Sequence, residues 1–363
     1  MNADEIIVND FIEDFYNTNF EYLRLIFENM DVLFKSCNML LDIFGNLIFD
    51  NEFEIELEKI KPSSFVKNMM LINDFYKKLH INFQIDEVAN KGILDITTND
   101  REKVIKNKDD EAFYGGWTNY LDDGKKSIEV NNNGLVTDSS IWVHELTHYR
   151  NQDDDGRSEV GDILTETMSF TYELIYLDYL EKDYPYEAKA LRIDMIMNTY
   201  SQCFVDTWNM MILFIIYDKL GNITEENFKV IFPNYAIDDS YERLIDYANT
   251  YIVDNDEITD SLLYTIATML SIYMFMEYKK DNSFIEKIEM FNAKINNSTI
   301  EELFNIINLT NYTDDGIFNE NNFKKLLESF GSYKDILFND LVALKGIEQS
   351  MDSVKGRTCH YPK

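Results

Sequence analysis

Apolar residues recur every three, four or seven positions along much of the chain, and this spacing is typical of amphipathic helices. Within residues 6–49, large apolar side chains follow this spacing: Phe11, Phe15, Phe20, Leu23, Ile26, Phe27, Met30, Leu33 and Phe34. We expect a further helix over residues 64–80, directly after Pro62. The whole chain has only four prolines and 13 glycines, so few residues would interrupt such helices.

Residues 81–137 follow a different pattern. Two short runs, Ala112–Tyr120 and Lys126–Asn131, carry aromatic and β-branched residues, and Asp123-Gly124 between them is a hairpin-type turn signal. This predicts a small β-sheet. From residue 138 the chain is expected to be helical almost to its end, with breaks near 151–157, 181–187, 219–224, 232–238, 252–257, 293–298 and 309–318. The pattern therefore predicts a mainly α fold with one small sheet inserted before its middle.

The net charge of the chain argues against two classes of binding partner. The 363 residues include 33 Lys and Arg against 66 Asp and Glu, a formal net charge of −33. Nucleic-acid binding through phosphates needs a cationic surface, so we expect no nucleic-acid partner, and no docking on anionic membranes either. A hydrophobic content of 45% and an aromatic content of 14% exclude a disordered chain.

The cysteines and the apolar runs bear on location. Three cysteines lie far apart, at Cys37, Cys203 and Cys359, and imply neither a disulfide framework nor a cysteine-based zinc ribbon. The acidic start MNADEIIVNDF lacks the cationic region of a secretory signal. The longest apolar runs, Met210–Tyr217 and Leu262–Met276, are shorter than the ~20 residues of a membrane-spanning helix. We therefore expect a cytoplasmic protein.

The segment Thr137–Gln152, TDSSIWVHELTHYRNQ, carries the most specific chemistry. Asp138 or Ser139 can cap the start of a helix. Inside that helix lies an H-E-x-x-H motif, formed by His144, Glu145 and His148. Positions i and i+4 share one helical face, so both imidazoles can reach one zinc ion, and Glu145 can deprotonate a metal-bound water.

A catalytic zinc usually has a third protein ligand. The best candidate is Glu166, which follows His148 by 18 positions, within an expected second helix over Ser158–Leu180 that packs antiparallel to the first. Ser169 and Glu173 fall on the same face of that helix and are expected to orient the ligands. Asp162 and Glu159 remain rival ligands.

These motifs resemble those of a known family. H-E-x-x-H followed by E-x-x-S-x-x-x-E, here Glu166 to Glu173, is similar to the M3 metallopeptidases, which include thimet oligopeptidase and the oligoendopeptidase F branch. Tyr264-Thr-Ile-Ala-Thr268 resembles the family's tyrosine-rich Y-x-Y-A-T segment. The resemblance covers residues from about 110 to 310, and its zinc core is the specific part. The string HELTH also occurs in thermolysin-like enzymes, but their aspartate four residues after the glutamate ligand is Phe170 here.

The resemblance implies a zinc peptidase of the gluzincin type, with one Zn²⁺ per chain. It assigns His144, His148 and Glu166 as metal ligands and Glu145 as the general base. It also implies that Tyr264 stabilises the oxyanion. The family's substrate lies along a strand edge, and the matching region here contains Gly115 and Gly116. Residues 1–110 would then be a reduced N-terminal helical lid on a catalytic region over 111–363, the two forming one compact unit.

The chain also departs from the family. The spacing between the second histidine and the glutamate ligand is shorter, and the chain is shorter overall. The family's histidine before the Y-A-T segment is missing, because Asp254-Asn-Asp256-Glu257 stands there; only His80 or His360 could replace it. Loss of one oxyanion donor typically costs about 3–4 kcal/mol of transition-state stabilisation.

We therefore expect a zinc-dependent endopeptidase or oligopeptidase whose acidic surface attracts cationic peptide substrates. The alternative is a degenerate relative that keeps zinc and binds a peptide or protein without cleaving it. A zinc hydrolase acting on a non-peptide amide is a third interpretation. The sequence indicates no particular oligomeric state.

Overall fold

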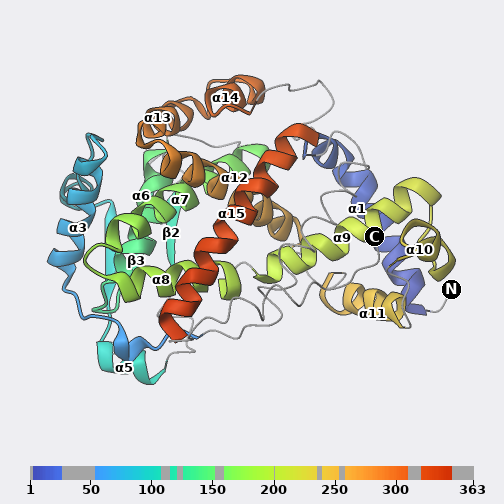
Figure 1. Ribbon diagram of the computed structural model, residues 1–363, viewed down its shortest axis with the longest axis horizontal. Coiled ribbons are helices and arrows are strands. Elements are labelled where there is room, and N and C mark those ends of the chain that lie inside the picture. Colours follow the sequence, from blue (N-terminus) through green and yellow to red (C-terminus); the bar gives the residue numbers. More distant parts are fainter. Residues whose placement is uncertain are drawn as a thin grey trace.

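The described part of the protein is mainly helical with a small three-stranded sheet (Figure 1), as the sequence pattern predicts. The computed structural model describes most of the chain in nine stretches: residues 3–26, 54–107, 115–120, 126–151, 159–199, 201–234, 239–252, 258–309 and 320–345.

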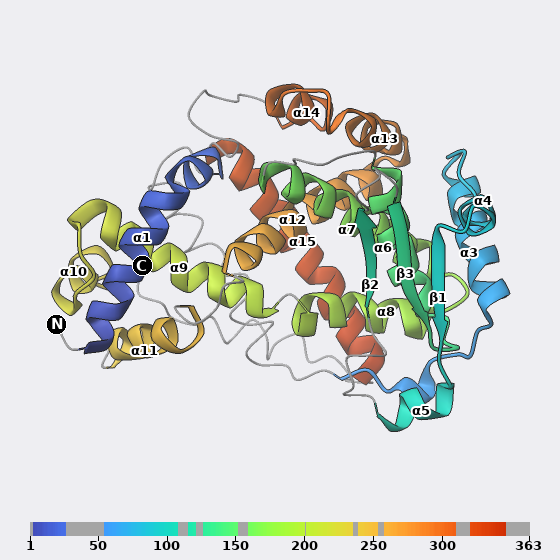
Figure 2. The same ribbon diagram turned by 180° about the vertical axis from the view of Figure 1, so that it is seen from behind.

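The sheet lies at one end of the molecule and presents an edge strand (Figure 2). Its strands are β1 (Leu94–Thr98), β2 (Gly116–Tyr120) and β3 (Lys126–Asn132), in the order β1-β3-β2. Strands β2 and β3 are antiparallel, as expected for the two aromatic and β-branched runs, whereas β1 and β3 are parallel. The expected turn at Asp123-Gly124 lies outside the described residues. Among the described strands, β2 pairs only with β3, so no described strand pairs with its other edge.

The two helices expected in the N-terminal part are present where the chain is described. Helix α1 spans Ala3–Ile26, and α3 spans Phe65–Lys78. Ser64 begins α3 because its side chain accepts a hydrogen bond from the backbone N–H of Lys67. Residues 27–53, where more of the apolar spacing lies, are outside the described part. The short elements η1 (Leu57–Lys59), α4 (Ile85–Asn90) and α5 (Arg101–Lys106) are additions that the pattern did not predict.

Beyond residue 138 the described chain is helical, as predicted. The successive helices are α6 (Asp138–Arg150), α7 (Glu159–Leu180), α8 (Pro185–Asp194), α9 (Ser201–Leu220), α10 (Glu225–Ile231), α11 (Ser240–Tyr247), α12 (Ile258–Lys280), α13 (Ile285–Lys294), α14 (Ile300–Ile306) and α15 (Glu320–Lys345). The breaks expected at 181–187, 219–224 and 293–298 each include a junction between two of these helices, although each also overlaps a helix end by two or three residues. The other expected breaks lie partly outside the described residues. The π-helical turns η3 (Met195–Thr199) and η4 (Ala248–Ile252), and the short 3₁₀ turn η5 (Asn282–Phe284), were not predicted.

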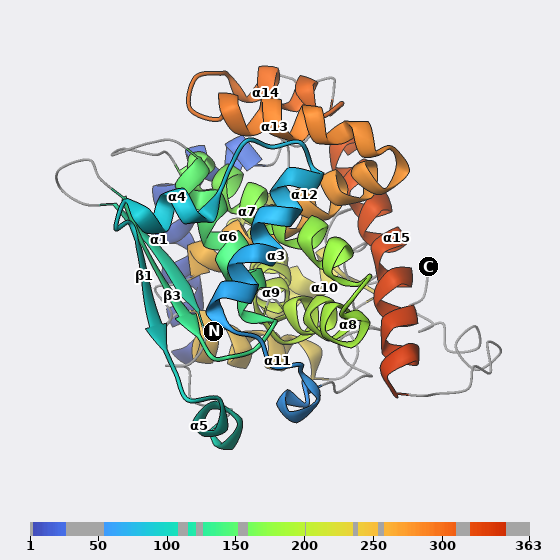
Figure 3. The same ribbon diagram turned by 90° about the vertical axis from the view of Figure 1, so that its left-hand side faces the viewer.

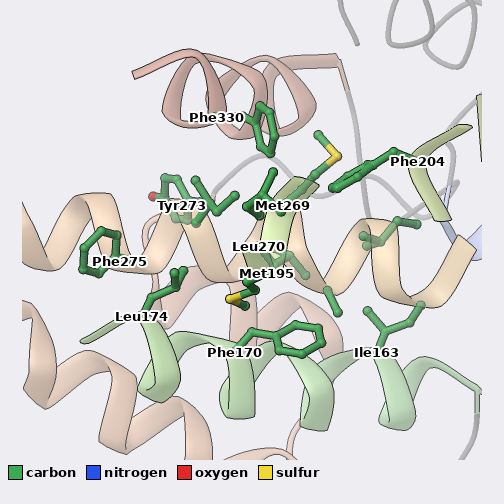
Figure 4. Packing of buried hydrophobic residues seen from close by; sticks show 14 of the residues in the cluster. Ile163, Phe170, Leu174, Met195, Phe204, Met269, Leu270, Tyr273, Phe275 and Phe330 are labelled. Carbon is green, nitrogen blue, oxygen red and sulfur yellow. The ribbon is translucent and has the colours of Figure 1, made fainter. Parts of the chain in front are cut away.

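The core forms around α7 and α12, two long helices rich in apolar residues (Figure 4). Ile163, Phe170 and Leu174 of α7 lie beneath Leu270 of α12, and Phe330 of α15 closes the cluster from the other side. The same continuous cluster reaches α1 and α3, so buried residues on both sides of residue 110 pack together. The boundary between a lid and a catalytic region stays a prediction.

Helix α6 packs between the sheet and α7, which places its middle turns in the interior (Figure 3). The indole of Trp142, on α6, donates a hydrogen bond to the carbonyl of Asn131 on β3 at 2.8 Å. In the same view α15 lies on the opposite side of the helical core from the sheet. Within the described residues, no helix combines the length and apolar character needed to cross a membrane.

Candidate metal centre

The helix that carries the H-E-x-x-H motif begins differently from the expected cap. Its N-cap is Thr137, without a side-chain hydrogen bond, so the expected capping by Asp138 or Ser139 is wrong. The Asp138 carboxylate instead accepts hydrogen bonds from the backbone N–H groups of Asn133, at 2.8 Å, and Leu135, at 3.0 Å. Burial raises the pKa of Asp138 to about 7, although these hydrogen bonds act in the opposite direction. Asp138 therefore fixes the loop that leads from β3 into α6.

Helices α6 and α7 are antiparallel, as the spacing between the two motifs predicts. Tyr176 near the end of α7 donates to the hydroxyl of Ser139 near the start of α6, at 2.7 Å. Further along, His148 near the end of α6 faces Glu166 in the first half of α7. The connecting segment 152–158 lies outside the described residues.

The three predicted ligands converge on one point. The Nε2 atoms of His144 and His148 are 3.2 Å apart. Glu166 places Oε2 at 3.5 Å from the first of these atoms and Oε1 at 3.3 Å from the second. A tetrahedral zinc site with bonds of about 2.0–2.1 Å needs donor atoms that are about 3.3 Å from one another. The spacing and the chemistry of this donor set therefore fit one zinc ion.

The rival carboxylates are not part of this group. His144, His148 and Glu166 are the side chains of the described residues that gather within reach of one ion, and Asp162 is not among them. The side chain of Glu159 lies outside the described part of the chain.

The pKa values of two of the proposed ligands, His144 and Glu166, are strongly shifted. Burial disfavours a charged His144, but hydrogen bonds to Glu166 and Glu173 outweigh it and raise the pKa of His144 well above its ordinary value. Burial also disfavours ionised Glu166, yet the charge of His148 and hydrogen bonds from both histidines hold its pKa well below the ordinary range. A buried carboxylate between two imidazoles is a site built for positive charge.

Glu173 contacts the ring nitrogen of His144 that faces away from the proposed metal position. Its Oε2 lies 3.2 Å from Nδ1 of His144, and its Oε1 accepts a hydrogen bond from Ser140 at 2.9 Å. This bond leaves Nε2 of His144 as the atom facing the metal position. The hydroxyl of Ser169 is buried and makes no hydrogen bond within the described part of the chain, so its expected contact with a ligand stays a prediction.

Glu145 points toward the sheet side of α6 and meets the edge strand β2. Its Oε2 accepts a hydrogen bond from the hydroxyl of Thr118 at 2.8 Å. Gly116, two residues earlier, lies so close that a Cβ there would be 2.7 Å from Cγ of Glu145. Gly115 has φ of +101°, a conformation that favours glycine. The two glycines thus have local structural reasons for their positions.

Tyr264, the expected oxyanion donor, comes from α12 and is partly buried. The ring of Phe170 packs near both groups, with its centroid 6.1 Å from that of Tyr264 and 5.1 Å from that of His144. Burial, followed by the negative charges of Glu166 and Asp260, raises the pKa of Tyr264 well above its ordinary value. The phenol therefore stays protonated and can donate a hydrogen bond.

Of the two candidates for the missing histidine, the structure describes only His80. His80 is exposed at the end of α3 and is outside the metal-ligating group. Asp254, Asp256, Glu257 and His360 lie outside the described part. Cys203 is a free thiol, and burial raises its pKa to about 11; the other two cysteines are also outside that part.

The sequence did not indicate Thr118 or Ser140 as contributors to the site. Thr118 could have been found from its alternation with Gly116 along a strand, and Ser140 from its place one helical turn before His144.

Comparisons with protein-family profiles, curated proteins and solved structures find no match to the chain.

Proposed function

We propose that this protein is a zinc-dependent peptidase of the gluzincin type, with a reduced M3-like architecture. The observation that carries the proposal is the convergence of His144, His148 and Glu166 from two antiparallel helices, with donor atoms 3.2–3.5 Å apart. The H-E-x-x-H motif supplies the neighbouring Glu145, a residue that is 6% exposed. The resemblance of the E-x-x-S-x-x-x-E segment to the M3 metallopeptidases points to the same chemistry.

Several residues of the chain have distinct roles in the proposed peptide hydrolysis. Zinc, when bound, would lower the pKa of a water molecule and polarise the scissile carbonyl. Glu145 accepts a proton from the attacking water and delivers it to the leaving amine. The protonated phenol of Tyr264 donates to the oxyanion as it forms. Glu173 keeps His144 in the tautomer that binds through Nε2.

An extended peptide is the substrate that the surroundings favour. The open edge of β2 offers backbone hydrogen-bonding groups to a peptide in extended conformation, and this edge adjoins Glu145 through Gly116 and Thr118. A net charge of −33 would draw cationic peptides toward the site and repel acidic ones, more strongly at low salt.

Zinc content and cleavage of a peptide library test the proposal together. We expect one zinc per chain in wild type and in Glu145→Gln, with cleavage lost in the variant alone. His144→Ala and Glu166→Ala should lose both zinc and cleavage. If Glu145→Gln cleaves as fast as wild type, the mechanism is wrong. Stoichiometric zinc without cleavage of any peptide would favour the alternative, a protein that binds peptides without turnover.

A further inference from the structure

The inner face of β2 contacts the proposed general base at two points. Gly116 and Thr118 are two residues apart, so both face α6. The hydroxyl of Thr118 lies 2.8 Å from Oε2 of Glu145 and 3.1 Å from its backbone carbonyl. A Cβ at Gly116 would be 2.7 Å from Cγ of the same glutamate. One strand therefore holds both the stem and the carboxylate of one side chain.

The hydrogen bond distinguishes the two carboxylate oxygens. A threonine hydroxyl has one proton to donate, and the carboxylate is a stronger acceptor than the backbone carbonyl at the longer distance. Oε2 of Glu145 is thus occupied by Thr118. No hydrogen bond from a described side chain to Oε1 accompanies it, so Oε1 is the oxygen left to exchange a proton with water and substrate.

The strand that holds Glu145 is also one of the two edge strands of the described sheet. Strand β2 pairs with β3 alone among the described strands, from Gly116↔Val130 to Tyr120↔Lys126. A peptide added to the open edge would lie beside the same residues that hold the carboxylate. The same strand would then position both the substrate backbone and the general base. This would keep the distance between the base and the scissile bond constant.

We propose that Thr118 is a positioning residue for Glu145: with Gly116 it holds the carboxylate so that Oε1, and not Oε2, carries the proton during peptide hydrolysis. This inference rests on the proposed function, since it assigns how the base of that reaction is oriented. The hydrogen bonds of the Thr118 side chain within the described residues both go to Glu145, so Thr118 acts on the reaction through that residue.

A series of variants at Thr118 separates positioning from packing. Thr118→Val has the same shape and lacks the donor, whereas Thr118→Ser keeps it. With zinc bound, we expect Thr118→Val to lower kcat by roughly 10–100-fold at unchanged KM and zinc content. Thr118→Ser should stay within about threefold of wild type. Asn119→Ala, on the opposite face of the same strand, is the control and should leave kcat unchanged. If Thr118→Val does not fold, Thr118→Ala replaces it.

A crystallographic comparison of the zinc-loaded variants provides a readout that does not depend on turnover. We expect the Glu145 carboxylate to keep its bond to residue 118 in wild type and Thr118→Ser, and to leave that orientation in Thr118→Val. An unchanged carboxylate or an unchanged kcat in Thr118→Val would overturn the inference. If wild type binds zinc and cleaves nothing, the proposed function fails, while the crystallographic result still decides whether Thr118 orients Glu145.

Discussion

Removal of Glu173 should weaken zinc binding although this residue does not touch the metal position. Its Oε2 is 3.2 Å from Nδ1 of His144, and its Oε1 accepts a bond from Ser140 at 2.9 Å. A hydrogen bond to a charged acceptor is worth about 1.5–3 kcal/mol, which corresponds to roughly 10–100-fold in an equilibrium constant. Changes behind a metal-bound histidine have effects of the same size.

Two substitutions at Glu173 separate the contribution of its charge to zinc affinity from that of its hydrogen bond. Glu173→Gln keeps an acceptor for His144 but removes the charge, and we expect zinc affinity to fall about tenfold. Glu173→Ala removes the acceptor, and we expect a loss of about 100-fold. It also leaves the buried hydroxyl of Ser140 without its acceptor, which should lower the metal-free unfolding free energy by about 1–3 kcal/mol.

The assay is competition for zinc against a chromogenic chelator at fixed pH, with thermal unfolding of the metal-free proteins measured in parallel. Glu277→Ala is a matched control, because the side chain of Glu277 is 24% exposed against 15% for Glu173 and pairs only with Lys280 among the described ion pairs. Zinc affinity of Glu173→Ala within twofold of wild type would refute the argument, and so would an equal loss in the control.

Three further predictions concern stability, each measured by denaturant unfolding of the metal-free protein. Gly116→Ala should cost about 1–3 kcal/mol, because its Cβ would lie 2.7 Å from a side-chain carbon of α6; Gly331→Ala, with open space around it, should be neutral or add up to about 1 kcal/mol. Similar values for the two would contradict the packing argument. Burial raises the pKa of Asp138 to about 7, so the unfolding free energy of wild type falls as pH rises from 5 to 8. Asp138→Asn lacks this titration, so its unfolding free energy should rise by about 2–3 kcal/mol relative to that of wild type over the same range. Parallel plots of unfolding free energy against pH for the two proteins would disprove this. Glu289→Gln should cost about 1–3 kcal/mol, because Arg150 would lose a carboxylate whose two oxygens both lie 2.8 Å away, and a neutral result would show that the pair adds no stability.

Local signals in the sequence predicted the long helices and the antiparallel pair of strands. The helix expected over residues 64–80, directly after Pro62, corresponds to α3, and the runs on either side of Asp123-Gly124 correspond to β2 and β3. Strand β1 was missed because Leu94–Thr98 is short and polar and pairs in parallel with a strand about thirty residues later. Such a pairing leaves no local pattern.

The convergence of the proposed metal ligands could be predicted because the i, i+4 spacing of His144 and His148 places both side chains on one face of a helix. Glu166 followed from the expectation of an antiparallel second helix. The residues that orient these groups could not be predicted in the same way. Thr118 reaches Glu145 across an interface between a strand and a helix, and the pairing depends on how the sheet packs against α6.

The most direct test of the account is diffraction data from the purified protein at the zinc absorption edge. The account predicts one anomalous peak, about 2.0–2.1 Å from Nε2 of His144, from Nε2 of His148 and from the carboxylate of Glu166. A protein saturated with zinc that shows no peak at this position, or one held by other side chains, would contradict the account.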